Sequence, residues 1–192
     1  MFMPGTTPGG PAAGGGGPPA APADDGKNRD LLSDKIDKSQ CYARNESTQY
    51  PWTNLLIGDT RLGCKSDADE QLILHVEFQE FVKVHSVKFT EFNSGRDPSE
   101  SPTLIKLYIN RCNMGFEDVE DVDPTQVIEL TAADLKEDAD PIKLQFVKFQ
   151  RVRSITFFVE ENDGGDVSAM GGLKLFGRTV ATTNMKDFKA QG

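Results

Sequence analysis

Three acidic residues, Asp67, Asp69 and Glu70, stand together in the stretch CKSDADEQLILHVEF, at the start of a run in which polar and apolar residues alternate. Carboxylates at this spacing are candidates for two kinds of chemistry, the binding of Ca²⁺ and general acid–base catalysis. An EF-hand loop that began at Asp67 would need glycine at its sixth position and glutamate at its twelfth, where the chain has Leu72 and Phe78. The sequence therefore excludes an EF-hand and leaves open a calcium site assembled from separate loops.

The acid–base alternative depends on where the carboxylates point. Asp69 and Glu70 are adjacent, so in an extended chain their side chains face opposite sides, and a catalytic pair would need another carboxylate from elsewhere in the fold. The two histidines, His75 and His85, have no nucleophile motif beside them and are too few for a histidine-rich zinc site. We expect His75, on the face opposite the apolar residues, to be solvated. We interpret the acids as a polar turn before a strand or as a partner contact, and assign no catalytic residue, cofactor or metal ligand.

The three cysteines, Cys41, Cys64 and Cys112, form no C-x-x-C pair, which excludes a dithiol redox motif and a zinc knuckle. The chain starts with MFMPGTTPGG, which has neither the basic nor the apolar region of a signal peptide. We therefore expect a protein of the cytoplasm, or of both cytoplasm and nucleus, in which the thiols are reduced. Cys41 is the best candidate for a redox role if its loop is exposed. The alternative is a buried, structural thiol.

The overall charge narrows the class of partner. A net charge of −9 and a pI near 4.7 oppose binding to nucleic acid and to anionic membranes. No apolar run approaches the roughly 20 residues of a membrane-spanning helix. Nothing in the sequence indicates a coiled coil, so we expect a monomer whose partners are proteins.

The chain divides into three parts. Residues 1–27 begin with a stretch rich in glycine, proline and alanine, which we expect to be disordered. Residues 28–182 have the composition of a folded domain, and residues 183–192 form a C-terminal tail. Apolar residues at positions 31, 32 and 36 indicate one or two helical turns at the start of the domain.

The middle part has the pattern of an all-β protein. Period-two alternation or β-branched and aromatic enrichment predicts strands over 72–78, 82–89, 104–110, 127–130, 142–149, 154–160 and 173–176. The connections differ widely in length, which favours a jelly-roll β-sandwich. The acidic run FEDVEDVDP is expected to be a solvated loop beside exposed Met114 and Phe116. Trp52 is expected to cap the core, or with Tyr50 to stack on a sugar ring.

Four segments, CYARNES, SDADEQLILHVEF, PIKLQFVKFQRVRSITFFVEEN and GRTVATTNMKDFK, together resemble the PITH domain, the proteasome-interacting module of a thioredoxin-like protein. The family's three motifs fall on Ser66, Asp67, Asp69, Glu70 and Leu72; on Lys148, Phe149, Gln150, Val152 and Ser154; and on Thr183, Met185, Phe188 and Lys189. We expect a version without the thioredoxin domain, because that domain's C-x-x-C is absent.

This resemblance implies a jelly roll similar to galactose-binding domains and a non-enzymatic association with subunits of the proteasome regulatory particle. The residues that it suggests for partner binding are Asp67, Asp69 and Glu70 of the motif. The tail adds Met185 and Phe188, apolar side chains beyond the last strand that could anchor a partner. The alternative function is the binding of a carbohydrate or another small ligand.

Overall fold

The computed structural model describes Gly5 and residues 30–94 and 97–180. An antiparallel sheet of eight strands has the order β1-β10-β4-β8-β5-β6, with β2 and β7 also paired to β4, and β3 pairs with β9 in a separate ribbon. The strands are β1 (Asp30–Leu31), β2 (Tyr42–Arg44), β3 (Cys64–Lys65), β4 (Leu72–Thr90), β5 (Pro102–Ile109), β6 (Gln126–Glu129), β7 (Ile142–Lys143), β8 (Val152–Asn162), β9 (Ala169–Met170) and β10 (Gly172–Thr179).

The helical elements are short. The one α-helix in the described part of the chain is α1 (Phe116–Asp121). Five 3-10 helices occupy Ser33–Lys35, Lys38–Gln40, Trp52–Leu56, Pro98–Glu100 and Phe146–Phe149. Among the described residues, no helix has both the length and the apolar character needed to cross a membrane.

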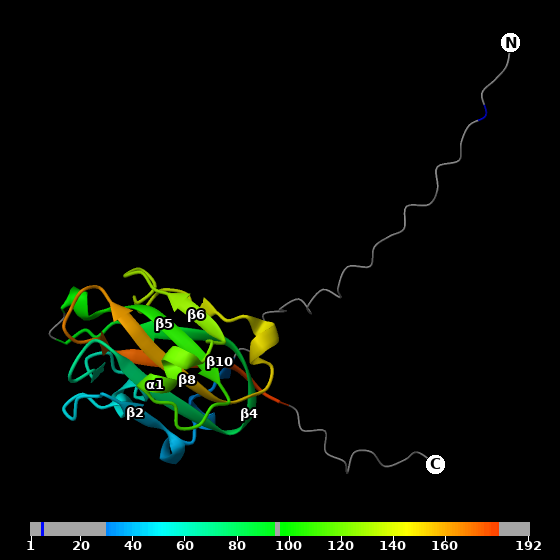
Figure 1. The fold of residues 1–192 in the computed structure, drawn as a ribbon, viewed down its shortest axis with the longest axis horizontal. Coiled ribbons are helices and arrows are strands. Elements are labelled where there is room, and N and C mark those ends of the chain that lie inside the picture. The colour runs from blue at the N-terminus through cyan, green and yellow to red at the C-terminus, as the bar shows by residue number, and fades with distance from the viewer. Residues whose placement is uncertain (1–4, 6–29, 95–96, 181–192) are drawn as a thin grey trace.

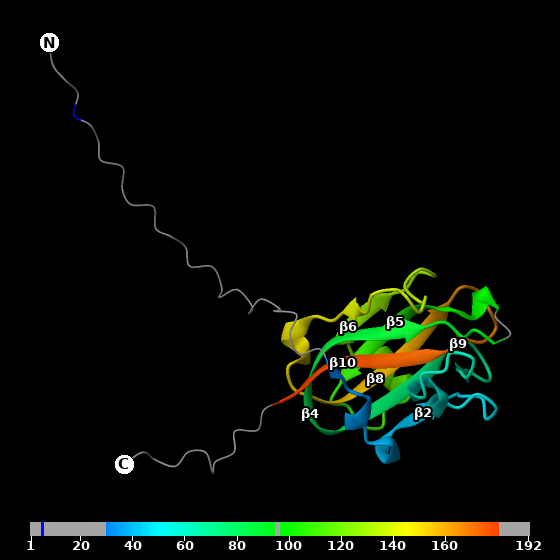
Figure 2. The ribbon, with the colours of Figure 1, turned by 180° about the vertical axis from the view of Figure 1, so that it is seen from behind.

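Strand β4 belongs to both layers of the sandwich. We predicted two strands, over 72–78 and 82–89, and the structure instead has one of 19 residues. No turn-forming residue stands between Phe78 and Val82, so the chain stays extended. The register with β8 shifts between Glu77 and Val82. The first half of β4 pairs with β2 and β8 and the second half with β10 and β7, and Figures 1 and 2 show β8 and β10 on opposite sides of the molecule.

The main core fills the space between these layers. The predicted inward face of the first half of β4 is confirmed, because Leu72, Leu74, Val76 and Phe78 are all buried in it. Phe89 in the second half of β4 meets Phe157 of β8 edge to face, with ring centroids 5.8 Å apart. Each fully buried side chain of this size contributes about 1.5–3 kcal/mol, so this contact between the layers is part of what holds the sandwich closed.

A second apolar cluster lies on the outer face of β4, β8 and β5, under α1 (Figure 1). The predictions of a solvated loop and an exposed Met114 were wrong. Met114 is 3% exposed and Val119 4% exposed, and both pack on Ile73, Tyr108 and Phe158 of the sheet. The three sheet residues would be exposed to water without the helix. The apolar face of α1 packs on them, and its acidic side chains point to solvent.

One other local prediction needs correction. Residues 142–149 form the short strand β7 and then a 3-10 helix, whose Phe149 is fully buried. The helical turns predicted at the start of the domain are confirmed as 3-10 turns at Ser33–Lys35 and Lys38–Gln40. The short strand β1 precedes them, and Leu32 donates its N–H to the carbonyl of Leu175 on β10. A turn at Thr131 is held by two hydrogen bonds that its N–H and Oγ1 donate to the carboxylate of Asp134. Trp52 is 8% exposed and lies in the main core, as the core-capping interpretation expected.

Candidate interaction surfaces

The acidic motif forms a turn, residues 66–71, that is tied to the end of β2 by one side chain. Asn45 donates from Nδ2 to Asp69 Oδ1 (2.8 Å) and to the carbonyl of Gln71 (2.6 Å). Its own Oδ1 accepts the N–H of Ala68 (3.0 Å), and its carbonyl accepts the N–H of Asp67 (2.9 Å). Asp69 Oδ1 also accepts the N–H of Gln71 (3.0 Å). The carboxylate of Asp69 therefore organises the turn.

The other side of this acid turn is attached to the loop before β9. Ser66 and Ser168 are both buried and exchange hydrogen bonds: Ser66 N–H donates to the carbonyl of Ser168, and Ser168 N–H donates to Ser66 Oγ (2.8 Å). Ser168 Oγ donates to the carbonyl of Glu70 (2.6 Å). Asp67 and Asp69 are exposed and Glu70 is half-buried. The motif thus holds two loops together, and its exposed carboxylates face solvent at the entrance to β4.

Within residues 30–94 and 97–180, no three histidine, cysteine, aspartate or glutamate side chains come together closely enough to hold a metal ion. Of the five residues suggested for partner binding, Asp67, Asp69 and Glu70 lie in the one acid turn. Met185 and Phe188 lie outside the described residues.

The prediction that His75 is solvated was wrong. The side chain is 2% exposed, with Nδ1 2.9 Å from Thr156 Oγ1 and Nε2 3.1 Å from Glu77 Oε2. Tyr42, opposite His75 in the β2–β4 register, stacks on the imidazole with ring centroids 4.7 Å apart. Strand β2 therefore occupies the edge of β4 opposite β8, and its Tyr42 ring helps to bury His75.

Beside this cluster, between the two halves of β4, the guanidinium groups of two arginines lie near one aromatic ring. The Cζ atom of Arg151 is 4.0 Å from the centroid of the Phe81 ring, and that of Arg153 is 6.0 Å away. Arg153 Nε also lies 3.8 Å from Glu77 Oε1. We call Phe81, Arg151 and Arg153 the arginine patch. No signal in the sequence around Phe81 pointed to this contact.

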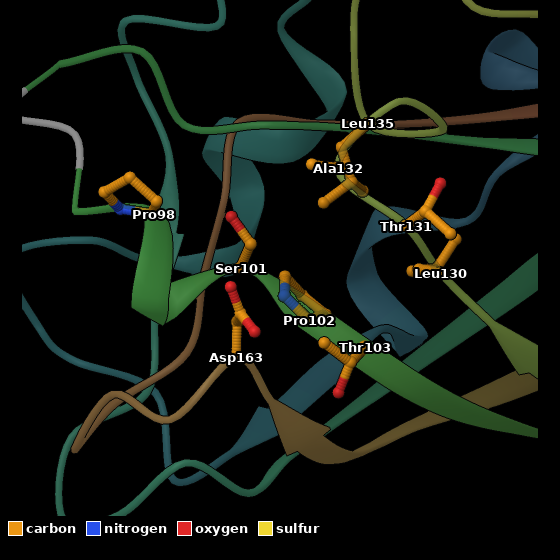
Figure 3. Close-up of a pocket in the computed structure, with 9 residues that line it drawn as sticks. All are labelled: Pro98, Ser101, Pro102, Thr103, Leu130, Thr131, Ala132, Leu135 and Asp163. Carbon is orange, nitrogen blue, oxygen red and sulfur yellow. The ribbon is translucent and has the colours of Figure 1, made fainter.

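The described surface has several hollows, with volumes from about 150 to about 530 Å³. One of about 150 Å³ has Ser101 and Asp163 on one side and residues 130–135 on the other (Figure 3). Its lining is Pro98, Ser101, Pro102, Thr103, Leu130, Thr131, Ala132, Leu135 and Asp163, none of them aromatic. Tyr50 is half-buried with its ring edge to face with Phe92, and Trp52 is buried. Neither ring is presented as a platform for a sugar.

The cysteines differ in their surroundings. Cys41 is half-buried rather than exposed, with Sγ 3.2 Å from the carbonyl of Asp37, and burial raises the pKa of its thiol. Burial also raises the pKa of Cys64 to about 12, with Glu46 adding to the effect. Cys112 is exposed. A raised pKa lowers the fraction of reactive thiolate at neutral pH, so Cys41 has the surroundings of a structural thiol.

This difference predicts the order of alkylation by iodoacetamide in the native protein near neutral pH. We expect Cys112 to react first, Cys41 more slowly than free cysteine, and Cys64 only after denaturation, because access falls in that order and burial lowers the thiolate fraction of Cys41 and Cys64. Mass spectrometry of tryptic peptides over time measures the three rates. A Cys41 that reacts faster than free cysteine would restore the redox interpretation.

The comparisons with known proteins agree with this geometry. The sequence profile described as the PITH domain matches residues 22–192. Thioredoxin-like protein 1 of Schizosaccharomyces pombe is 36% identical over 151 residues, which cover 78% of this chain and 51% of that protein, so the chain spans about half the length of this relative.

Similar solved structures include carbohydrate-binding modules from Clostridium perfringens. The CBM32 domains of ZmpB match with a TM-score of 0.60 and 9% identity, over 76% of this chain and 35% of that one. The family 32 module of NanJ, solved with galactose, matches with a TM-score of 0.53 and 12% identity, over 76% and 97%. At these identities the likeness concerns the fold alone, and it confirms the predicted galactose-binding-like jelly roll.

Proposed function

Because this chain belongs to the PITH domain family, we propose that it is a protein-interaction module without catalytic activity of its own and that it associates with the regulatory particle of the proteasome. The observation that carries the proposal is the continuous match to that family over residues 22–192. The proposed setting is the cytoplasm or also the nucleus, where a monomeric, acidic domain with unpaired thiols would meet this partner.

The use of the motif residues supports an interaction role. The Asp69 carboxylate organises a loop, and Ser66 holds another, so these side chains stabilise the scaffold. We propose that the exposed carboxylates of the acid turn, Asp67 and Asp69 with Glu70, contact the partner. The tail residues Met185 and Phe188 are the proposed apolar anchors of the same association, since apolar side chains buried at an interface carry much of its binding energy.

The direct test is affinity capture from a lysate of the source organism on the immobilised 192-residue chain, read by mass spectrometry. We expect enrichment of regulatory-particle subunits relative to an unrelated domain of equal charge, which controls for electrostatic adsorption. A folded chain that enriches no proteasome subunit would contradict the proposal.

The tail has its own prediction. Met185→Ala combined with Phe188→Ala is expected to reduce the recovery of proteasome subunits about tenfold or more, because two apolar anchors are removed. The matched control is Val127→Ala with Val147→Ala, which removes two exposed apolar side chains from the sandwich. Thermal unfolding should be the same for both variants. Unchanged recovery with the tail variant would exclude these two residues as anchors.

The fold is similar to that of sugar-binding modules, but the side chains give little support to the alternative function of carbohydrate binding. Likeness to sugar-binding modules is a likeness of scaffold, and one scaffold serves many ligands. The aromatic residues that could stack on a sugar, Tyr50 and Trp52, are packed against other parts of the chain.

A further inference from the structure

The arginine patch contains a guanidinium group that is positioned but not neutralised. Arg151 is exposed and stacks on Phe81, and among the described residues no carboxylate forms an ion pair with it. Arg153 has a side chain 45% exposed and a single acidic neighbour, Glu77, at 3.8 Å. That carboxylate also lies 3.1 Å from His75 Nε2. The patch therefore carries more positive than negative charge.

The backbone under the patch is held in place. Asn110 donates from Nδ2 to the carbonyl of Arg151 (3.0 Å) and accepts the N–H of Arg153 at Oδ1 (2.7 Å). Val152, between the two arginines, is fully buried in the main core. These contacts fix where both arginine side chains leave the surface, so less conformational entropy is lost when they bind a ligand.

Stacking on an aromatic ring occupies the face of a guanidinium group and leaves its N–H edge available. That edge matches a carboxylate, with two parallel hydrogen bonds. Phe81 is half-buried, so part of its ring is also open to an apolar side chain. Two donors of this kind beside one ring suit an extended segment in which acidic and apolar residues stand close together.

We propose that Phe81, Arg151 and Arg153 form a docking surface for an acidic segment of a partner protein. Charge complementarity favours this occupant: the patch is a positive area on a chain of net charge −9. A nucleic acid strand would meet the same arginines, but its many phosphates would be repelled by the rest of the chain. The inference depends on this surface alone and does not require that the partner be the proteasome.

The probe is a fluorescein-labelled peptide with four glutamates around a central phenylalanine, titrated with the full 192-residue chain and followed by fluorescence anisotropy. We expect binding that weakens as salt is added, because the contacts are exposed ion pairs. Arg151→Gln with Arg153→Gln should weaken it about tenfold, since two charge-assisted contacts are lost. Phe81→Leu should weaken it less.

Two controls isolate the patch. Arg61→Gln with Lys136→Gln makes the same change in net charge at exposed basic residues away from Phe81 and should leave the affinity unchanged. The same peptide with glutamines in place of glutamates should not bind. Equal affinity in both double variants, no binding of the acidic peptide, or tighter binding of a single-stranded oligothymidine would each overturn the proposal. None of these results depends on the lysate experiment, so either proposal can fail alone.

Discussion

Replacing Gly177 by alanine is expected to lower the free energy of unfolding by about 3 kcal/mol or more. Gly177 lies in β10 where the register with β4 shifts, between Phe176 and Gly177. A Cβ atom at this position would overlap the carbonyl oxygen of Lys83 and would lie 3.1 Å from Val84 Cα. Both obstacles are backbone atoms of the central strand, so relief requires the two strands to separate. Glycine in a strand often marks such a close approach.

Gly172→Ala is the matched control because it is the same substitution in the same strand. A Cβ atom there would lie 3.5 Å from the side chain of Thr90, which is ordinary contact. We expect an effect within about 1 kcal/mol. Urea unfolding of both variants, compared at the transition midpoint, measures the difference. If the two midpoints agree, β10 does not approach β4 as closely as described.

The second large effect is expected at Asn45, where alanine should destabilise the domain by about 2 to 3 kcal/mol. Asn45 has a φ of 65°, a left-handed conformation that asparagine tolerates better than alanine. Its side chain also makes the hydrogen bonds that hold the acid turn, including the one to the half-buried carbonyl of Gln71. Alanine would strain the backbone and leave these partners without Asn45.

Two further variants separate the contributions. Asn45→Gly removes the hydrogen bonds without the backbone strain. Asn113→Ala introduces strain alone, because Asn113 has a φ of 54° and makes no side-chain hydrogen bond among the described residues. We expect each to cost less than Asn45→Ala when unfolding is measured in urea. If Asn45→Ala lowers the free energy of unfolding no more than Asn113→Ala does, solvent replaces the hydrogen bonds of the Asn45 side chain.

The strands that the sequence predicted correctly are those whose signal is local. Alternation over 104–110 corresponds to β5, where Ile105 and Leu107 share the buried inner face. The β-branched and aromatic residues over 154–160 correspond to β8, which is buried on both faces. The length of β4 was missed because a break was placed at residues 79–81, which are turned toward solvent or half-buried but remain extended.

The remaining errors depend on contacts between distant parts of the chain. His75 is buried by Tyr42 and paired to Thr156, and neither partner is visible from the sequence around it. Helix α1 forms over an apolar outer face that only the assembled sheet creates. At the candidate surfaces, family resemblance indicated the acids of the turn but not that Asn45 holds them. An asparagine directly after a strand was the available signal, since asparagine is enriched at left-handed positions.

The arrangement of β4 between β8 and β10 also has a consequence for the protein during its synthesis. The second half of β4 is synthesised long before its main partner, β10, because about 80 residues separate Thr90 from Gly172. At a translation rate of about 5–20 residues per second, β10 follows β4 after roughly 4–16 s. Throughout that interval the nascent chain carries a long apolar strand with an unpaired edge, the kind of segment that associates with other chains. The yield of folded protein in a cell should therefore depend on chaperones that act on the growing polypeptide as much as on the stability of the finished domain.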